Sequence, residues 1–572
     1  MNSIKIIFSR FKGYLKDYIP QFCIAVLGMI MAAIGTAGSA YLIKDVLDEI
    51  FISKNESLLY ILPYIVVAVF FLKALGTYLQ QYFTAYIGHD MVRRFRFMLL
   101  ENLLRLDLSF FNRLRTGELI SRNTNDIDRI RNVVSSMIPD FAREVITAIC
   151  LLAVVIYQSP KLAFFALVVF PAAIYPLSLL ARKIKKYSHQ SQAKIGDMTS
   201  ALSEIFTNIE IIKANNAANK ELERFKSHNE RFFHLNIKAE RTSTLVNPLM
   251  ETLGAVGIAI VIIIGGSEVI SGALSVGGFF SFTTALFMLY TPIKRISYLY
   301  NKMQDALAAT ERTFELLNQS PNIIGGNLEF PRNLLSISFN DVRFGYDENE
   351  ILKGVSFKAN SDEIIGIVGT SGGGKTTIIN LLMRFYDANN GQILINQSEI
   401  SDFELQSLRQ NIGIVTQRIY IFNDTIAANV AYGAKEIDEN RVINALKVAN
   451  AWDFVENMEG GVHAMLDEFG ANLSGGQRQR IAIARALYNE PRILIFDEAT
   501  SALDFESERI ITDVIERIRS GRIIFVIAHR QSSIKNATKI LVLDGGGKVV
   551  GFDSKEALLQ NCDAFKKLSH IE

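Results

Sequence analysis

Cysteine is scarce in this chain of 572 residues, which contains only Cys23, Cys150 and Cys562. The three are widely separated, and two of them fall within apolar runs. A disulfide framework or a thiolate metal site needs several cysteines at short, regular spacings. The sequence therefore favours neither.

A surplus of charge of one sign is also missing. The 60 lysines and arginines nearly balance the 58 acidic residues, which leaves a formal net charge of +2, and no arginine-rich tail occurs. Chains that bind nucleic acid through charge usually carry a clear basic excess. We therefore expect no nucleic-acid partner.

Apolar residues, by contrast, are abundant. They make up 49% of the chain against 21% charged residues, and the mean hydropathy is positive, at +0.21. The length is too great for one compact domain. This proportion of apolar residues is high for a soluble enzyme, but the chain is too polar to lie wholly in lipid. This composition predicts a membrane domain joined to a soluble domain.

Six apolar segments in the first half are candidates to cross a membrane, which takes about 20 apolar residues in a helix. A cleaved signal peptide is the alternative for the first segment, but the run is long and further spans follow it. An even number of spans places both termini on the same side. The predicted spans are Phe22–Leu42, Leu59–Ile87, Val145–Gln158, Leu162–Ala181, Leu253–Ser267 and Val276–Ile293.

Positive charge in the connecting segments indicates the orientation. Basic residues precede the first span and follow the second and fourth, whereas the opposite loops are short and nearly free of them. Because basic loops stay in the cytoplasm, we expect both termini to be cytoplasmic. The helix-prone segments Gly88–Ser136 and Arg182–Asn247 are then predicted to be helices that continue well beyond the bilayer, each pair joined by a short turn.

The hydropathy pattern changes near residue 320. Gly325, Gly326 and Pro331 mark a linker, after which short β-branched strands alternate with helices. This alternation is typical of an α/β domain. We expect a transmembrane domain over 1–320, a linker over 321–334 and an α/β domain over 335–572.

A phosphate-binding loop is the strongest single motif. The pattern GxxxxGK[ST] directly follows an expected strand, Ile364–Val368, and opens an expected helix. Glycines let backbone N–H groups surround phosphates, the lysine adds positive charge, and the hydroxyl of Thr376 can bind Mg²⁺. The residues expected to hold the nucleotide phosphates are Gly369, Thr370, Ser371, Gly372, Gly373, Gly374, Lys375, Thr376 and Thr377.

A second strand, Ile493–Phe496, ends in the acids Asp497 and Glu498. Ligands of open α/β sheets bind at the carboxyl ends of the strands. Asp497 can therefore hold Mg²⁺, and Glu498 is placed to polarise the water that attacks the nucleotide.

Further motifs carry a resemblance to a known family. Leu473, Ser474, Gly475, Gly476 and Gln477, followed by the helix-prone run 478–487, resemble the signature motif of ATP-binding cassette (ABC) proteins. Other elements similar to those of the family surround it in the expected order, namely Tyr346, Gln417, the segment 501–504 that ends in Asp504, and His529. Six spans before one cassette resemble an ABC exporter half-transporter over essentially the whole chain.

The resemblance implies roles that the residues alone do not. Tyr346 is expected to stack on adenine, Gln417 to help bind Mg²⁺ with Thr376 and Asp497, and His529 to act near the γ-phosphate with Glu498 as the catalytic residues. Ser474 and its neighbours would act on ATP bound to a partner cassette, so the resemblance implies a homodimer that works by alternating access. Regions near Phe110–Ser121 and Ile211–Glu221 would dock on the cassettes, where Asp467–Gly470 resembles a contact element.

Three basic residues lie in or beside apolar spans: Lys73, Arg143 and Lys294. Charge at mid-bilayer is costly, so such residues usually face a cavity or a partner. One reading is that Glu144 pairs with Arg143 and that Lys294 reaches the interface. The other is a ring of cations, doubled by dimer symmetry, that receives anionic headgroups.

The sequence around these cations is similar to that of the cavity-lining basic residues in bacterial lipid A flippases. That similarity implies a phosphorylated glycolipid, moved from the inner to the outer leaflet of a bacterial inner membrane. The alternative cargo is a set of amphipathic drugs, which a cavity dominated by the aromatic residues Phe280, Phe282, Phe287 and Tyr290 would favour.

Overall fold

The computed structural model of the chain describes residues 13–14, 16–114, 116–346, 349–498, 505–528 and 531–569. Contacts divide the chain into two compact units. One comprises Met1–Glu101 and Ile120–Asn318, and the other comprises Asn102–Leu119 and Gln319–Glu572. The second unit thus includes a short segment from far upstream in the sequence.

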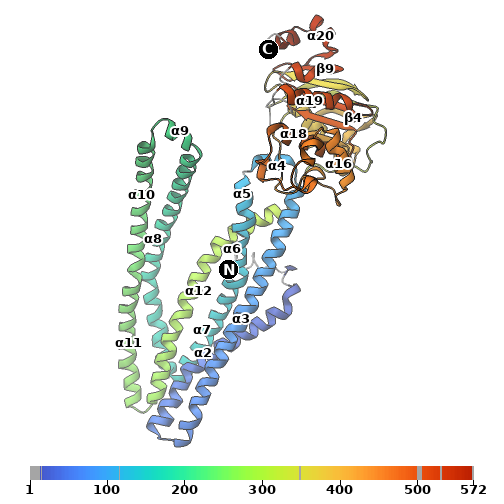
Figure 1. Cartoon of the computed structure of the whole chain (residues 1–572). Coiled ribbons are helices and arrows are strands. Elements are labelled where there is room, and N and C mark those ends of the chain that lie inside the picture. Colours follow the sequence, from blue (N-terminus) through green and yellow to red (C-terminus); the bar gives the residue numbers. More distant parts are fainter. Residues whose placement is uncertain are drawn as a thin grey trace. The chain divides into compact units, whose positions relative to one another are not determined.

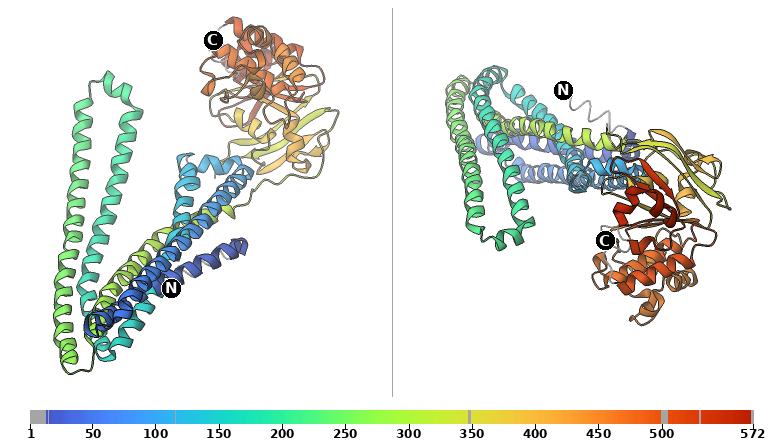
Figure 2. Two further views of the ribbon diagram at one scale, coloured as in Figure 1. Left: turned by 60° about the horizontal axis from the view of Figure 1, so that its bottom comes forward. Right: turned by 90° about the horizontal axis from the view of Figure 1, so that it is seen from above.

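The first unit is helical, as predicted. As expected, α3 (Glu56–Arg105) and α8 (Pro160–Thr207) continue beyond the predicted second and fourth spans, and α8 lies beside α10 (Ala218–Thr244) (Figures 1 and 2). The described residues between α3 and α7 form short helical elements and not one long helix. The helices are α2 (Ile19–Asp45), α3 (Glu56–Arg105), α6 (Ile127–Asn132), α7 (Ile138–Gln158), α8 (Pro160–Thr207), α9 (Ile209–Ala214), α10 (Ala218–Thr244), α11 (Val246–Ile270) and α12 (Val276–Leu317).

Within the described residues, four helical segments are long and apolar enough to cross a membrane: Lys16–Ile52, Glu56–Arg105, Glu251–Ile270 and Val276–Ile296. They contain the predicted first, second, fifth and sixth spans. The predicted third and fourth spans lie within α7 and α8.

Glycines let α2 and α3 approach each other closely. A Cβ atom on Gly76 would lie 2.6 Å from the carbonyl oxygen of Gly28, and a Cβ on Gly28 would lie 2.6 Å from that of Gly76. Farther along, a Cβ on Gly35 would lie 2.7 Å from the Cβ of Lys73. Small residues at such crossings allow direct backbone packing between membrane helices. The base of Lys73 is therefore fixed against α2.

The second unit holds two sheets, which confirms the predicted α/β domain. In the six-stranded sheet the order is β10-β9-β3-β8-β7-β6, with every pair parallel except β10 and β9. Its strands are β3 (Ile364–Gly369), β6 (Ile412–Val415), β7 (Ile493–Asp497), β8 (Ile523–Ile527), β9 (Lys539–Leu543) and β10 (Val549–Asp553). The four-stranded antiparallel sheet contains β1 (Ser336–Phe344), β2 (Leu352–Asn360), β4 (Asn390–Ile395) and β5 (Ser398–Glu399) in the order β2-β1-β4-β5.

Short helices complete this unit. The upstream segment contributes α4 (Leu108–Arg113) and the start of α5 (Thr116–Ser121). The others are α13 (Lys375–Leu382), α14 (Leu405–Gln410), α15 (Ile426–Val430), α16 (Glu439–Val448), α17 (Trp452–Glu456), α18 (Gly475–Leu487), α19 (Phe505–Arg517), α20 (Lys555–Asn561) and α21 (Asp563–Ser569).

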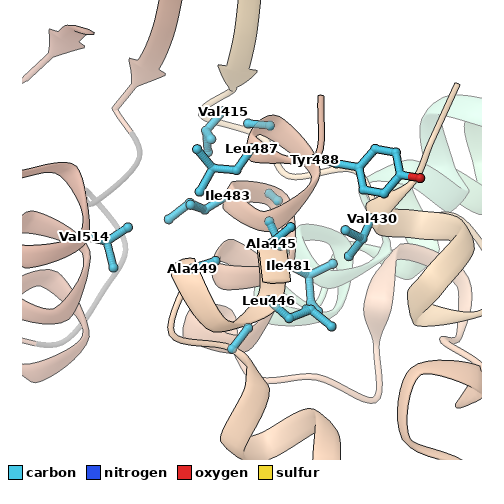
Figure 3. Close-up of a cluster of buried hydrophobic side chains, with 14 of the residues drawn as sticks. Val415, Val430, Ala445, Leu446, Ala449, Ile481, Ile483, Leu487, Tyr488 and Val514 are labelled. Atoms are coloured by element: carbon cyan, nitrogen blue, oxygen red, sulfur yellow. The ribbon is translucent and has the colours of Figure 1, made fainter. Parts of the chain in front are cut away.

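The apolar side chains of α18 form the centre of a buried cluster (Figure 3). Ile481 and Ile483 are fully buried, and they share the cluster with Leu446 of α16 and Val415 of β6. Each such side chain contributes about 1.5–3 kcal/mol when removed from water. This core fixes α18, and with it the signature motif at the start of the helix.

We expect Gly76→Ala to destabilise the transmembrane unit by about 1–3 kcal/mol, because the added methyl group forces α3 away from α2. Thermal unfolding of the purified chain would show this as a lower Tm. Gly254→Ala is the matched control, since nothing lies within 4 Å of its added Cβ. Equal effects of the two substitutions would contradict the tight crossing.

Candidate functional site

The phosphate-binding loop lies between β3 and α13. Gly372 and Gly374 have φ values of +81° and +91°, a region that residues with a Cβ rarely adopt. Lys375 is buried, and its Nζ donates to the carbonyl oxygens of Gly369 at 2.8 Å and Thr370 at 3.2 Å. Burial lowers the pKa of Lys375, while Glu498 and Asp497 act in the opposite direction. The loop thus surrounds the ammonium group of Lys375, whose charge the carboxylates of Asp497 and Glu498 stabilise.

The acidic residues stand at the carboxyl end of β7, as the sequence predicts: Asp497 is its last residue and Glu498 follows it. β8 pairs in parallel with both β3 and β7, so the loop and the acids lie at the same edge of the sheet. Gln417, which follows β6, donates from Nε2 to Oε2 of Glu498 at 2.5 Å. Glu498 has a φ of +49°, which is uncommon for a residue other than glycine. Its amide donates to the carbonyl oxygen of Ile527 at 3.1 Å and so ties this conformation to β8.

The donors at this edge suit a hard divalent cation. Carboxylate, amide and hydroxyl oxygens are the protein ligands that Mg²⁺ prefers, together with phosphate oxygens and water. Asp497, Gln417 and Thr376 offer one of each type.

Tyr346 stands beside the start of α13. Its hydroxyl accepts a hydrogen bond from Nδ2 of Asn380 at 2.8 Å and lies 3.4 Å from Oγ1 of Thr377. Its ring packs against Phe344 and Tyr386 with centroid distances of 5.0 and 4.9 Å. The residue remains 39% exposed, so its aromatic surface is accessible to a base.

Tyr386 also binds the upstream segment. Nδ2 of Asn112 in α4 donates to its hydroxyl at 2.8 Å. The carboxylate of Asp107 accepts from the amides of Asn322 at 2.7 Å and Ile323 at 3.2 Å. The region that the family resemblance marked for docking therefore contacts the cassette through α4. Asn112 lies in that predicted region, but the sequence did not identify Tyr386 as its partner.

The signature motif begins α18. Ser474 is the N-cap: its Oγ accepts from the amide of Gln477 at 3.2 Å, and Oε1 of Gln477 accepts from the amide of Ser474 at 2.8 Å. Ser474 and Gly475 are exposed. A helix start of this kind favours an anion.

Arg485, at the other end of α18, fixes the chain that follows Gln417. Its guanidinium donates to the carbonyl oxygens of Asn429 and Tyr420, both at 2.7 Å. It also lies over the stacked rings of Phe422 and Tyr432. The signature helix and the loop that carries Gln417 are therefore connected. Asp504 and His529 lie outside the described residues.

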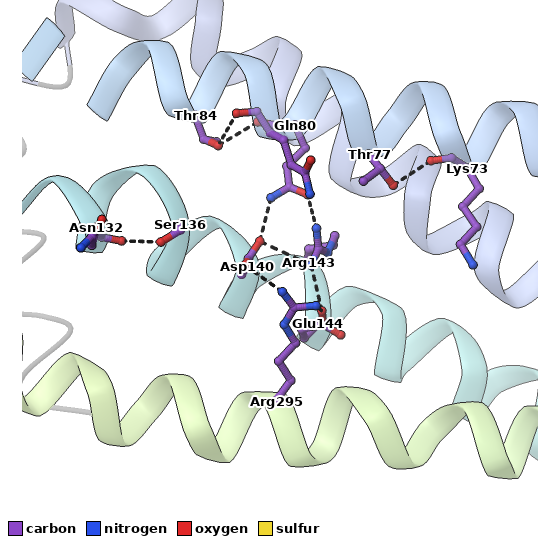
Figure 4. Close-up of polar contacts among 11 residues, drawn as sticks. Lys73, Thr77, Gln80, Thr84, Asn132, Ser136, Asp140, Arg143, Glu144 and Arg295 are labelled. Carbon is purple, nitrogen blue, oxygen red and sulfur yellow. Dashed lines mark hydrogen bonds and ion pairs between the residues drawn. The ribbon is translucent and has the colours of Figure 1, made fainter. Parts of the chain in front are cut away.

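A second group of charges lies in the transmembrane unit (Figure 4). Arg143 of α7 is buried and donates to Oε1 of Gln80 at 2.7 Å and to Oε1 of Glu144 at 3.0 Å. Asp140 lies 3.4 Å from it, and Arg295 of α12 pairs with both carboxylates. Of this cluster, Gln80, Asp140 and Arg295 were not identified from the sequence.

The structure does not bring Lys73 and Lys294 into this cluster. The Nζ of Lys73 lies 5.9 Å from the ring centroid of Phe70, and that of Lys294 lies 5.9 Å from that of Tyr290. Such distances allow a weak cation–π attraction. Among the described residues, neither lysine has a carboxylate within ion-pairing distance.

Two family models match the chain. Residues 22–293 match the model described as "ABC transporter transmembrane region", and residues 352–501 match the one described as "ABC transporter".

Several proteins are similar to this chain over nearly its full length. A protein of Syntrophus aciditrophicus (strain SB) named "ATP-dependent lipid A-core flippase" is 39% identical over 99% of this chain and 94% of its own length. Proteins of the same name from Desulfotalea psychrophila and Chromobacterium violaceum are 39% and 31% identical. The match to the Desulfotalea psychrophila protein covers 98% of both chains. The match to the Chromobacterium violaceum protein covers 99% of this chain and 97% of that protein.

We expect Tyr386→Phe to loosen α4 from the cassette, because it removes the acceptor of the Asn112 hydrogen bond. A net loss of about 1 kcal/mol would speed local amide exchange in residues 108–113 about fivefold, which hydrogen–deuterium exchange can measure. Tyr432→Phe is the matched control, since it removes a hydroxyl elsewhere in the cassette. Unchanged exchange in the Tyr386 variant would contradict this docking contact.

Proposed function

Because this chain belongs to the ABC transporter family, we propose that it is an ATP-driven flippase for a lipid A-core-type glycolipid. The similarity to three proteins of that name over at least 94% of both partners carries the proposal. The chain is an ATP-hydrolysing membrane transporter. The glycolipid, its passage from the inner to the outer leaflet, and a bacterial inner-membrane location with a cytoplasmic cassette and termini are the proposed parts.

The nucleotide site supports ATP hydrolysis through defined roles. Tyr346 stacks on the base, and the phosphates enter the loop where Lys375 supplies positive charge. Glu498 accepts a proton from the attacking water, and the hydrogen bond from Gln417 holds its carboxylate in place. Asp497, Thr376 and Gln417 would hold Mg²⁺, which neutralises charge on the β- and γ-phosphates when bound.

The signature motif supports a homodimer. One chain carries one cassette, and its exposed Ser474 heads α18. In the proposed dimer this helix start faces the γ-phosphate of ATP on the partner, with Asp504 beside the interface and His529 near the same phosphate. Closing two cassettes on two ATP molecules and opening them after hydrolysis would drive alternating access.

The headgroup site is proposed to use Lys73, Arg143 and Lys294. The two lysines have no carboxylate partner within ion-pairing distance in the described part of the chain, so their charges are available to an anion. Arg143 is paired with Asp140 and Glu144, so its charge is less available to an anion than those of the two lysines.

A multidrug exporter is the second candidate function. Phe280 and Phe287 of α12 are 49% and 51% exposed, which offers apolar area to a drug. Phe282 is fully buried and is not available for this role. The aromatic surface is therefore smaller than the sequence suggested.

We expect Glu498→Gln to bind ATP but to hydrolyse it about 10²-fold or more slowly, because the amide cannot accept the proton of the attacking water. Nucleotide binding and phosphate release, measured side by side on the purified chain, would show this split. Lys375→Ala should instead weaken nucleotide binding itself. Turnover of the Glu498 variant at the original rate would rule out this residue as the general base.

We expect lipid A to stimulate ATPase activity of the chain in nanodiscs saturably, with Glu498→Gln as the blank. The double alanine variant of Lys73 and Lys294 should lose most of this stimulation, because the anionic headgroup loses two cations. Arg143 is kept, since its removal would leave the buried Glu144 without its closest cation. Stimulation by amphipathic drugs but not by lipid A would favour the multidrug exporter.

A further inference from the structure

The buried charges of the transmembrane unit form a balanced cluster. Two guanidinium groups, from Arg143 and Arg295, face two carboxylates, from Asp140 and Glu144. Gln80 of α3, which is 1% exposed, donates to Asp140 at 3.1 Å and accepts from Arg143 at 2.7 Å. The formal charges therefore cancel, and α3, α7 and α12 each contribute at least one group.

Arg295 differs from the other charged members in exposure. Its side chain is 47% exposed, whereas those of Asp140, Arg143 and Glu144 are 17%, 11% and 8% exposed. Its contacts with the two carboxylates, at 3.3 and 3.4 Å, are similar in length to the contact of Arg143 with Asp140 at 3.4 Å. Arg143 also makes shorter bonds of 2.7 and 3.0 Å with Gln80 and Glu144.

The two arginines also differ in what their removal leaves behind. Without Arg143, the buried Glu144 would lose its closest cation, at 3.0 Å, and Asp140 would lose one of its two cations, which is strongly unfavourable. Without Arg295, both carboxylates keep Arg143, and Asp140 keeps its bond from Gln80. Arg295 is thus the member that can turn to a new anion at low cost.

We propose that Arg295 is an additional headgroup-binding residue, and that Asp140 and Glu144 compete with the transported anion for its guanidinium. This inference rests on the proposed flippase function. A phosphate group offers the oxygens that a guanidinium binds in a bidentate manner. Lys294, the preceding residue on α12, is also exposed and adds a second positive charge.

The location of Lys73 is consistent with the binding of an anion at Arg295. It lies seven residues before Gln80 on α3, which is about two helical turns and nearly the same face. Figure 4 shows its side chain extending from α3 on the side where Gln80 meets Arg143. A headgroup bound at Arg295 that extends about two helical turns along α3 would therefore reach Lys73.

Replacement of the two carboxylates by the transported anion at Arg295 makes the site selective for negatively charged ligands. A neutral amphipathic molecule cannot replace the carboxylates around Arg295, so the cluster stays closed to it. A phosphorylated headgroup can replace them. Competition by Asp140 weakens the binding of every anion, so Asp140 sets the affinity of the site, whereas Arg295 supplies its preference for anions.

Two substitutions in the full-length chain should act in opposite directions. Arg295→Gln should weaken binding of lipid A about tenfold, because one charge-assisted contact is lost, and should reduce the preference over dephosphorylated lipid A. Asp140→Asn should strengthen binding severalfold, because the amide still accepts from Gln80 but no longer holds Arg295 by charge. Native mass spectrometry of the chain in nanodiscs can measure these affinities.

Controls separate binding from folding. Arg93→Gln removes an arginine whose side chain is 76% exposed and is paired with Asp90, and it should leave lipid A affinity unchanged. Arg295→Lys keeps the charge without the planar fork, and we expect it to fall between the unmodified chain and Arg295→Gln. The Tm of each variant identifies a folding defect.

The outcomes distinguish the inference from the function on which it rests. Weaker binding in both Arg295→Gln and Asp140→Asn would mean a purely structural cluster and would overturn the inference. Unchanged binding in Arg295→Gln, with lipid A still preferred by the unmodified chain, would overturn it as well but leave the flippase function intact. If the unmodified chain shows no preference for the phosphorylated lipid, the flippase proposal itself fails, and the inference with it.

Discussion

Parallel pairing of β3 and β7 with β8 is the constraint on which the nucleotide site depends. The register aligns Ile364 to Ile367 with Ile524 to Ile527, and the same part of β8 with the end of β7. The strands therefore end together, which brings the phosphate-binding loop and Glu498 to one edge. Most of their side chains are buried in the sheet core, which fixes the positions of the strand ends. The loops supply the chemistry, while the strands supply the position.

Charge in the transmembrane unit follows a different rule. An apolar helix bundle cannot hold an isolated guanidinium at low cost, and Arg143 accordingly has two carboxylates and an amide around it. Lys73 is partly buried, and its ammonium group lies over an aromatic ring. The two residues differ in whether their charge is neutralised by a carboxylate. Arg143 is already neutralised, whereas Lys73 keeps its charge available.

Local patterns made much of the structure predictable. The phosphate loop, the acids after β7 and the strand–helix alternation each depend on neighbouring residues, and the structure confirms the α/β domain that they indicated. The pairing of Glu144 with Arg143 was open as an alternative, because the two are adjacent. Asp140 stands three residues before Arg143, a helical spacing that favours contact, and it could have been found. Arg295 could not, since 155 positions separate it from Asp140 and no pattern connects them.

The segment 102–119 makes the cassette discontinuous in sequence. Asp107 satisfies the amides of Asn322 and Ile323, and Asn112 satisfies the hydroxyl of Tyr386. A fragment that begins at the linker would lack these partners and leave the groups to solvent. The ring of Tyr386 contacts that of Tyr346, so the loss would reach the surface proposed to hold the base. A cassette cut out at its apparent boundary thus lacks the part of its own compact unit that contacts the ring beside Tyr346.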